Sequence, residues 1–208
     1  MTGWDKEYEL YKHQYQELFD DCMKKEQETN IEFLEKNISK KTGRKVVACS
    51  NGTDALYFSL LSLGIGKGDE VMTTAFSWIS TASVISMTGA TPVFCDIDIN
   101  TYHMSFESIT RMYSDKVKAI IYPHLFGNMS DISKIKLFCK DKNIKLIEDA
   151  CQSVGASFHG IQAGTLGDIS TYSFNANKVV AGISGGGAIL TNGDTDIFKK
   201  LRKHGEHE

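Results

Sequence analysis

Short apolar runs alternate with amphipathic stretches over most of the chain, from about residue 45 onward. The apolar runs have the length of buried strands, and the stretches between them carry apolar residues at the three- and four-residue steps of a helix. This alternation predicts βαβ units in a three-layer α/β/α fold with a mostly parallel seven-stranded sheet. The predicted strands are Val46–Cys49, Glu70–Thr73, Thr91–Asp96, Ala119–Tyr122, Lys145–Glu148, Ile169–Phe174 and Gly187–Thr191. The predicted helices between them are Thr53–Leu63, Ile79–Thr88, Phe106–Tyr113 and Ile132–Asp141.

Both ends of the chain are also predicted to be helical. Near the N-terminus, apolar or aromatic side chains recur at helical steps: Tyr8, Tyr11, Tyr15, Leu18, Phe19 and Cys22. Asn30 is a candidate N-cap for a second helix, which carries Ile31, Leu34 and Ile38. The segment from Asp194 to Arg202 has the pattern of a further helix. We therefore expect an N-terminal helical segment at 1–44 and one large domain at 45–208.

Composition excludes several classes of protein. The 208 residues are 41% hydrophobic, which is enough for a sizeable core, and 23 Lys and Arg against 26 Asp and Glu give a net charge of −3. A non-specific nucleic-acid binder would carry a basic excess. No run approaches the roughly 18 apolar residues of a membrane span, and the charged N-terminus is unlike a signal peptide, so we expect a soluble, cytoplasmic protein.

The cysteines favour reduced thiols over a metal site. They stand far apart without a C-x-x-C pair, which argues against a zinc site or a disulfide framework. The five are Cys22, Cys49, Cys95, Cys139 and Cys151.

In an open parallel sheet, ligands bind beyond the carboxyl ends of the strands, so the polar residues that follow each strand are the first candidates for ligand contacts. The turn Ser50–Leu56 leads from a strand into a helix, and Gly52 allows close approach to its backbone. The free N–H groups of Thr53 and Asp54 favour an anion such as phosphate. The alternative is an ordinary N-cap made by Asn51 or Thr53. A Walker lysine and a G-x-G-x-x-G pattern are both missing, which disfavours the common nucleotide-binding loops.

Two further strand ends carry candidate ligand contacts. Trp78 follows the second strand, where its ring either covers a planar ligand or belongs to the core. Asp149 ends the fifth strand, in a place where a carboxylate is costly unless it meets a cation or caps the next helix.

Lys178 follows the sixth strand in a glycine-rich loop that contains Gly182 and Gly185–Gly187. An amine there is placed to lose solvation and act as a nucleophile, although most loop lysines are simply solvated. Together these residues would hold an anion at Thr53 and Ser173, a flat ring against Trp78 and a ring nitrogen at Asp149. The ligand that carries all three groups, and a carbonyl for Lys178, is pyridoxal phosphate. An acid beside the ring nitrogen keeps it protonated and makes the ring an electron sink.

At this point the chain resembles the DegT/DnrJ/EryC1/StrS family of sugar aminotransferases, within the fold-type I, aspartate aminotransferase-like enzymes. The resemblance runs from about Val46 to Gly205 and includes many motifs in order: Ser50–Leu56, Gly66–Val71, Trp78, Gly89–Asp98, His124–Gly127, Glu148–Gln152, Ser173–Lys178 and His204-Gly205. The resemblance implies that Gly52, Thr53, Asp54 and Ser173 bind the phosphate. It also implies that Gln152 approaches the ring hydroxyl and that Lys178 forms the Schiff base.

The implied reaction moves an amino group from glutamate to a keto group of a nucleotide-linked deoxysugar, with catalysis by Lys178 and Asp149. Some members carry His at the lysine position and act as dehydratases, so Lys178 favours amino transfer. Family members are dimers of nearly twice this length with a smaller C-terminal domain, so 45–208 is expected to be a truncated cofactor-binding domain of a homodimer.

Two other functions stay open. One is a truncated pyridoxal-phosphate-binding or interaction domain without turnover. The other is a nucleotide-binding α/β domain whose loop 182–187 holds phosphate and in which Lys178 has no role.

Overall fold

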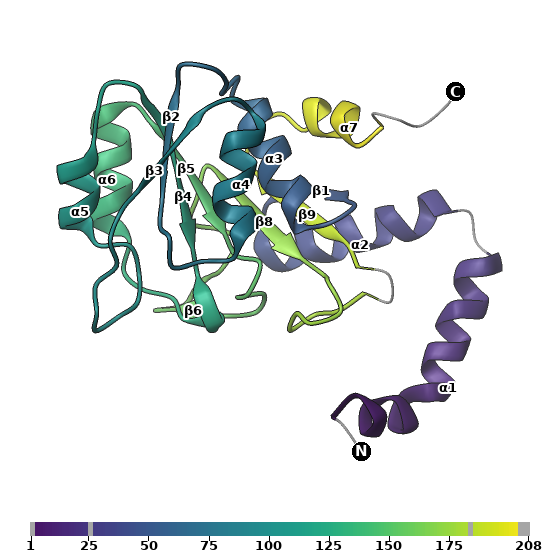
Figure 1. Cartoon of the computed structure of the whole chain (residues 1–208). Helices are drawn as coiled ribbons and strands as arrows, with labels where there is room; N and C mark the ends of the chain where they lie inside the picture. Colours follow the sequence, from purple (N-terminus) through teal and green to yellow (C-terminus); the bar gives the residue numbers. More distant parts are fainter. Residues whose placement is uncertain (1–2, 25–26, 183–184, 204–208) are drawn as a thin grey trace.

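The computed structural model describes residues 3–24, 27–182 and 185–203. A seven-stranded sheet has the order β1-β9-β8-β5-β4-β2-β3, with helices on both faces (Figure 1). Its strands are β1 (Lys45–Cys49), β2 (Glu70–Thr73), β3 (Thr91–Phe94), β4 (Val117–Pro123), β5 (Lys145–Asp149), β8 (Ile169–Ser173) and β9 (Gly187–Thr191). β9 runs antiparallel to both of its neighbours, and the other pairings are parallel. The predicted fold class is therefore confirmed.

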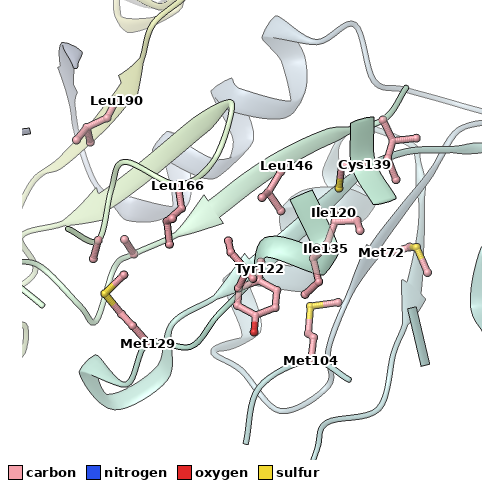
Figure 2. Packing of buried hydrophobic residues seen from close by; sticks show 14 of the residues in the cluster. Met72, Met104, Ile120, Tyr122, Met129, Ile135, Cys139, Leu146, Leu166 and Leu190 are labelled. Carbon is pink, nitrogen blue, oxygen red and sulfur yellow. The ribbon is translucent and has the colours of Figure 1, made fainter. Parts of the chain in front are cut away.

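The helices that flank the sheet are divided between its two faces. They are α3 (Gly52–Ser62), α4 (Ile79–Met87), α5 (Phe106–Met112), α6 (Ser133–Lys142) and α7 (Asp196–Arg202). Successive residues of β4 point to opposite faces, as the pleat requires. Ile121 packs in a cluster with Leu56 of α3 and Val84 of α4. Ile120 packs in the other cluster, with Ile135 of α6 (Figure 2).

The N-terminal helices are α1 (Gly3–Lys24) and α2 (Gln27–Thr42). In Figure 1, α1 extends away from the sheet, whereas α2 lies beside β1. The α2 residue Glu35 accepts hydrogen bonds from Ala48 N at 2.8 Å and Arg202 Nη1 at 2.6 Å, which links α2 and α7 to β1. The prediction that Asn30 caps this helix is wrong, because α2 begins three residues earlier and Asn30 lies inside it.

The element boundaries differ from the predicted ones by no more than two residues in the sheet and its flanking helices. Two short pieces were not predicted: the β6–β7 hairpin (Ser157–Phe158 and Ile161–Gln162) and the 3-10 turn η1 (Leu125–Gly127). Both are too short to show a hydrophobic period. No helix among the described residues is long and apolar enough to cross a membrane. His204-Gly205 and the side chain of Cys22 lie outside the described residues.

β9 pairs with both β1 and β8, so the carboxyl ends of these two strands flank the first residue of β9. Gly187, the first residue of β9, is in register with both Cys49 and Ser173. A Cβ at Gly187 would lie 2.3 Å from the carbonyl oxygen of Asn51, so only glycine allows this approach. The turn after β1 is thereby pressed against the end of β8, which sets up the candidate site.

Candidate active site

One cavity opens at the carboxyl edge of the sheet, between the strand ends and the starts of α3 and α4. Its lining includes seven of the eight residues that were predicted to bind cofactor: Gly52, Thr53, Trp78, Asp149, Gln152, Ser173 and Lys178. The eighth, Asp54, is not part of the lining. Residues more than 100 positions apart thus meet in a single space, as the edge rule for parallel sheets requires.

The first turn of α3 presents unpaired backbone donors to the cavity. Asn51 is the N-cap, and its Oδ1 accepts a hydrogen bond from Asp54 N at 2.8 Å. The Asp54 carboxylate accepts from Asn51 Nδ2 at 3.0 Å, so Asp54 completes the cap. Among the described residues, the N–H groups of Gly52 and Thr53 have no acceptor. The cap therefore leaves two amides free to receive an anion at the positive end of the helix.

Two hydroxyl side chains flank these amides. Thr53 Oγ1 lies 2.8 Å from Ser80 Oγ. Ser173 ends β8, and a Cβ at Gly52 would lie 2.7 Å from its Cβ and 3.1 Å from its Oγ. Ser173 is therefore in direct contact with the helix N-terminus, and the pair forms a cradle that a larger residue at position 52 would fill.

Asp149 provides a buried acid on another wall. Only 7% of its surface is exposed, and among the described residues no Lys, Arg or His nitrogen lies within 4 Å of its carboxylate. Oδ2 accepts a hydrogen bond from Thr81 Oγ1 at 2.9 Å, and Oδ1 accepts a longer one from Cys151 N at 3.3 Å. A buried carboxylate with two neutral donors and no cation is suited to a protonated ring nitrogen. The helix-capping alternative is excluded, because a turn and not a helix follows Asp149.

Gln152 is oriented by the turn after β4. Its Oε1 accepts a hydrogen bond from Phe126 N at 2.9 Å, so the Nε2 donor points to the other side of the amide. Phe126 adopts a left-handed conformation, with φ 58°, within η1. A residue other than glycine adopts this strained conformation only where its surroundings stabilise it. Here the conformation places the Phe126 N–H where it orients Gln152.

Glu148 and His124 form a buried pair beside the cavity, and His124 is one of the lining residues. His124 Nε2 lies 3.2 Å from Glu148 Oε1, and both side chains are fully buried. Glu148 also accepts hydrogen bonds from Gly164 N, Leu166 N, Gly167 N and Ser170 Oγ. Burial alone would raise the pKa of Glu148, but His124 and these donors outweigh it and lower the pKa. The pair links the end of β4 to β5 at the residue before Asp149.

Lys178 and Trp78 face one another across the open side of the cavity. Trp78 is 61% exposed, which excludes the core alternative for this ring. Lys178 Nζ lies 5.9 Å from the Trp78 ring centroid, within the range of a cation–π contact. The loop that carries Lys178 is closed by hydrogen bonds from Lys178 N to Asn175 O and from Gly182 N to Phe174 O. Residues 183–184 of the glycine-rich loop lie outside the described residues.

Cys151 and Lys178 bring a thiol and an amine to the cavity lining. Burial and the neighbouring Asp149 carboxylate raise the pKa of the Cys151 thiol well above its usual value, so the thiol stays neutral. Lys178 is the one amine among the described lining residues. The cavity thus offers an anion cradle, an acid, an aromatic face and an amine, and these residues fit pyridoxal phosphate.

Sequence reasoning missed the residues that hold the predicted ones in place. Thr81 on α4 and Ser77 before it both line the cavity. Their hydroxyl oxygens lie 2.8 Å apart. The four-residue spacing of the two hydroxyls at a helix start was a usable signal, because such residues share one face. The contact of Thr81 with an acid 68 residues away had no signal in the sequence.

The family model of the "DegT/DnrJ/EryC1/StrS aminotransferase family" matches residues 11–208. The chain is similar to a "Pleiotropic regulatory protein" of Geobacillus stearothermophilus, with 36% identity over 99% of this chain and 57% of the relative. It is also similar to a GDP-perosamine synthase of Caulobacter vibrioides, with 37% identity over 76% of this chain and 42% of that enzyme. The chain therefore spans about half the length of these relatives.

The structure is similar to that of NtdA from Bacillus subtilis with bound cofactor PMP. The TM-score is 0.76 and the identity 34%, over 85% of this chain and 40% of the other.

Proposed function

Because the chain belongs to the DegT/DnrJ/EryC1/StrS aminotransferase family, we propose that it binds pyridoxal phosphate and moves an amino group from glutamate to a keto group of a nucleotide-linked deoxysugar. The observation that carries the proposal is the shared cavity of Asp149 and Lys178, beside the unpaired amides of Gly52 and Thr53. The resemblance on which the sequence analysis relied is confirmed by the family match.

In this proposal, each wall of the cavity holds one part of the cofactor. The first turn of α3 and Ser173 hold the phosphate, with Asp54 supporting the cap that shapes this turn. Asp149 holds the ring nitrogen, and Gln152 Nε2 donates to the ring hydroxyl. Trp78 covers one face of the ring. When bound, the cofactor supplies a carbonyl for the amine and an electron sink for the carbanion at the substrate α-carbon.

The reactive groups of the chain are Lys178 and Asp149. Lys178 Nζ would hold the cofactor through its carbonyl carbon. When the amino donor takes that place, the free amine would accept the α-proton and deliver it to the former carbonyl carbon, as an amino transfer requires. The Asp149 carboxylate would accept the hydrogen of the ring nitrogen and so stabilise its protonated form.

The amino acceptor and the assembly are also part of the proposal. The name of the relative GDP-perosamine synthase supports a nucleotide-linked sugar as substrate. Exposed apolar side chains near the cavity, Phe76, Ile79 and Phe126, support a homodimer in which a second copy covers them. Cys49, Cys95, Cys139 and Cys151 are free, which supports a reducing, cytoplasmic location. We assign cofactor binding to a large domain at 45–208, preceded by the helical segment 1–44.

A second candidate is a domain that binds the cofactor without turnover. The glutamate experiment below separates it from the transaminase.

Borohydride reduction with pyridoxal phosphate, followed by peptide mapping, tests cofactor binding. We expect a single phosphopyridoxyl label on Lys178 and loss of the label in Lys178→Ala. A label spread over the exposed lysines, or one that persists in the variant, would overturn the proposal. Adding glutamate to the loaded protein then separates the two candidates. Conversion of the absorbance spectrum to that of pyridoxamine phosphate supports the transaminase, and an unchanged spectrum supports the binding domain.

A further inference from the structure

We propose that Thr81, supported by Ser77, is a positioning residue whose hydrogen bond holds the Asp149 carboxylate aligned with the cofactor ring nitrogen. The inference rests on the proposed function and deepens it, since it names the group that sets the direction of the acid. Thr81 lies in the first turn of α4 and is fully buried. Its Oγ1 lies 2.9 Å from Asp149 Oδ2 and 2.8 Å from Ser77 Oγ.

The hydrogens of these hydroxyls can be assigned by counting. Thr81 Oγ1 has one hydrogen, and an ionised Asp149 can only accept. Thr81 therefore donates to Asp149, and Ser77 must donate to Thr81. A chain of two hydroxyls directed at a carboxylate stabilises its charged form, because each donor polarises the next.

The carboxylate is also fixed in rotation. Oδ2 is held by Thr81, and Oδ1 is held from the other side by Cys151 N at 3.3 Å. The backbone contact is the longer of the two, so Thr81 makes the stronger restraint. Each oxygen keeps a lone pair for a further donor, and the carboxylate plane is set before any ligand arrives.

The same helical turn positions three parts of the cavity. Thr81 N donates to the carbonyl of Trp78 at 3.0 Å, so the aromatic residue and the donor to Asp149 belong to one hydrogen-bonded turn. Ser80, between them, contacts Thr53 Oγ1 at 2.8 Å at the anion end. The start of α4 thus sets the ring, the acid and the phosphate contacts relative to one another.

Three variants test the role of the hydroxyl. Thr81→Val keeps the shape but removes the donor, Thr81→Ser keeps the donor, and Thr88→Val is a matched control on the same helix. Thr88 caps the other end of α4, and its Oγ1 donates to Ile85 O, away from the cavity. The first readout is the ¹⁵N chemical shift of pyridoxal phosphate labelled at the ring nitrogen and bound to the whole chain. The second is the rate of pyridoxamine phosphate formation with glutamate.

In Thr81→Val we expect the ¹⁵N resonance to move toward the unprotonated position and the rate to fall about 10-fold or more, the equivalent of one lost hydrogen bond to a charged group. Thr81→Ser and Thr88→Val should keep the resonance of the starting protein, with rates within about 3-fold. A merely structural role would lower cofactor affinity but leave the resonance in place, and that result would overturn the inference.

Measurements on the unmodified chain distinguish failure of this inference from failure of the proposed function. If it converts glutamate and Thr81→Val matches it in resonance and rate, the inference fails and the proposed function stands. If the unmodified chain forms no adduct with pyridoxal phosphate, both fail. Should Thr81→Val show no cooperative melting, Ser77→Ala replaces it, since removing the outer donor should move the resonance in the same direction by a smaller amount. An unmoved resonance in Ser77→Ala would then overturn the inference.

Discussion

Replacing Gly52 with alanine tests the cradle between α3 and β8. The added Cβ would lie 2.7 Å from Ser173 Cβ and 2.9 Å from Cys151 Sγ. Ordinary contact begins at 3.4 Å, so Ser173 or the helix must retreat by 3.4 − 2.7 = 0.7 Å. Overpacking of this kind costs about 1–3 kcal/mol, and the better helix propensity of alanine returns at most about 1 kcal/mol. We expect the free energy of unfolding to fall by about 1–2 kcal/mol.

The effect on the cofactor should be larger than this loss of stability suggests. A shift of 0.7 Å lengthens the contacts of Ser173 and the α3 amides with a phosphate group. Loss of one charge-assisted hydrogen bond costs about 1.5–3 kcal/mol, which weakens binding about 10- to 100-fold. Urea denaturation measures the stability, and a fluorescence titration with pyridoxal phosphate measures the affinity.

Gly66→Ala is the matched control for this change. A Cβ at Gly66 meets only the Thr88 carbonyl oxygen, at 3.6 Å, and Gly66 does not adopt a left-handed conformation. It should therefore change stability by less than about 0.5 kcal/mol and leave the affinity unchanged. If Gly52→Ala binds pyridoxal phosphate as tightly as Gly66→Ala does, the reasoning from the cradle is refuted.

Three further predictions concern the acids and the thiols. Asp149→Asn should still accept the borohydride label but lose at least about 100-fold in the rate of pyridoxamine phosphate formation, measured by stopped-flow absorbance; an unchanged rate would contradict the role of the carboxylate. Glu148 has a lowered pKa in the folded protein, so its contribution to stability is full above its unfolded pKa of about 4.3 and is lost as the pH falls through the folded pKa. Glu148→Gln should accordingly cost about 3 kcal/mol at pH 7 and flatten the acid limb of the stability profile, measured by urea denaturation from pH 7 to pH 3; a parallel shift at every pH would count against this account. Burial raises the pKa of Cys49 and Cys139 to about 12 and that of Cys95 to about 11. A thiol reagent at pH 8 should therefore label these side chains slowly until urea unfolds the chain. Mass mapping identifies the labelled sites, and fast labelling of any of the three in the folded protein would contradict this prediction.

The sequence by itself determined the elements, the fold class and the edge where chemistry gathers. Alternating apolar runs and helical periods specify which residues form strands and helices, because burial of an apolar face requires that period. The topology of parallel sheets then brings strand ends together, so Asp149 and Ser173 were predicted at one edge without coordinates. The family resemblance rested on the same ordered motifs and is confirmed.

Only the tertiary structure decided which side chains meet at that edge. The periods of a sequence determine the buried face of an element but not its axial rotation or its distance from a neighbour, which depend on packing between segments far apart in the chain. For this reason a core position stayed open for Trp78 in the sequence, whereas its side chain is exposed. A phosphate contact was predicted for Asp54, which in the structure completes the Asn51 cap. The hydrogen bond from Thr81 to Asp149 joins a helix to a strand end across 68 residues. Such a contact depends on sub-ångström packing of whole elements, and local sequence patterns do not encode it.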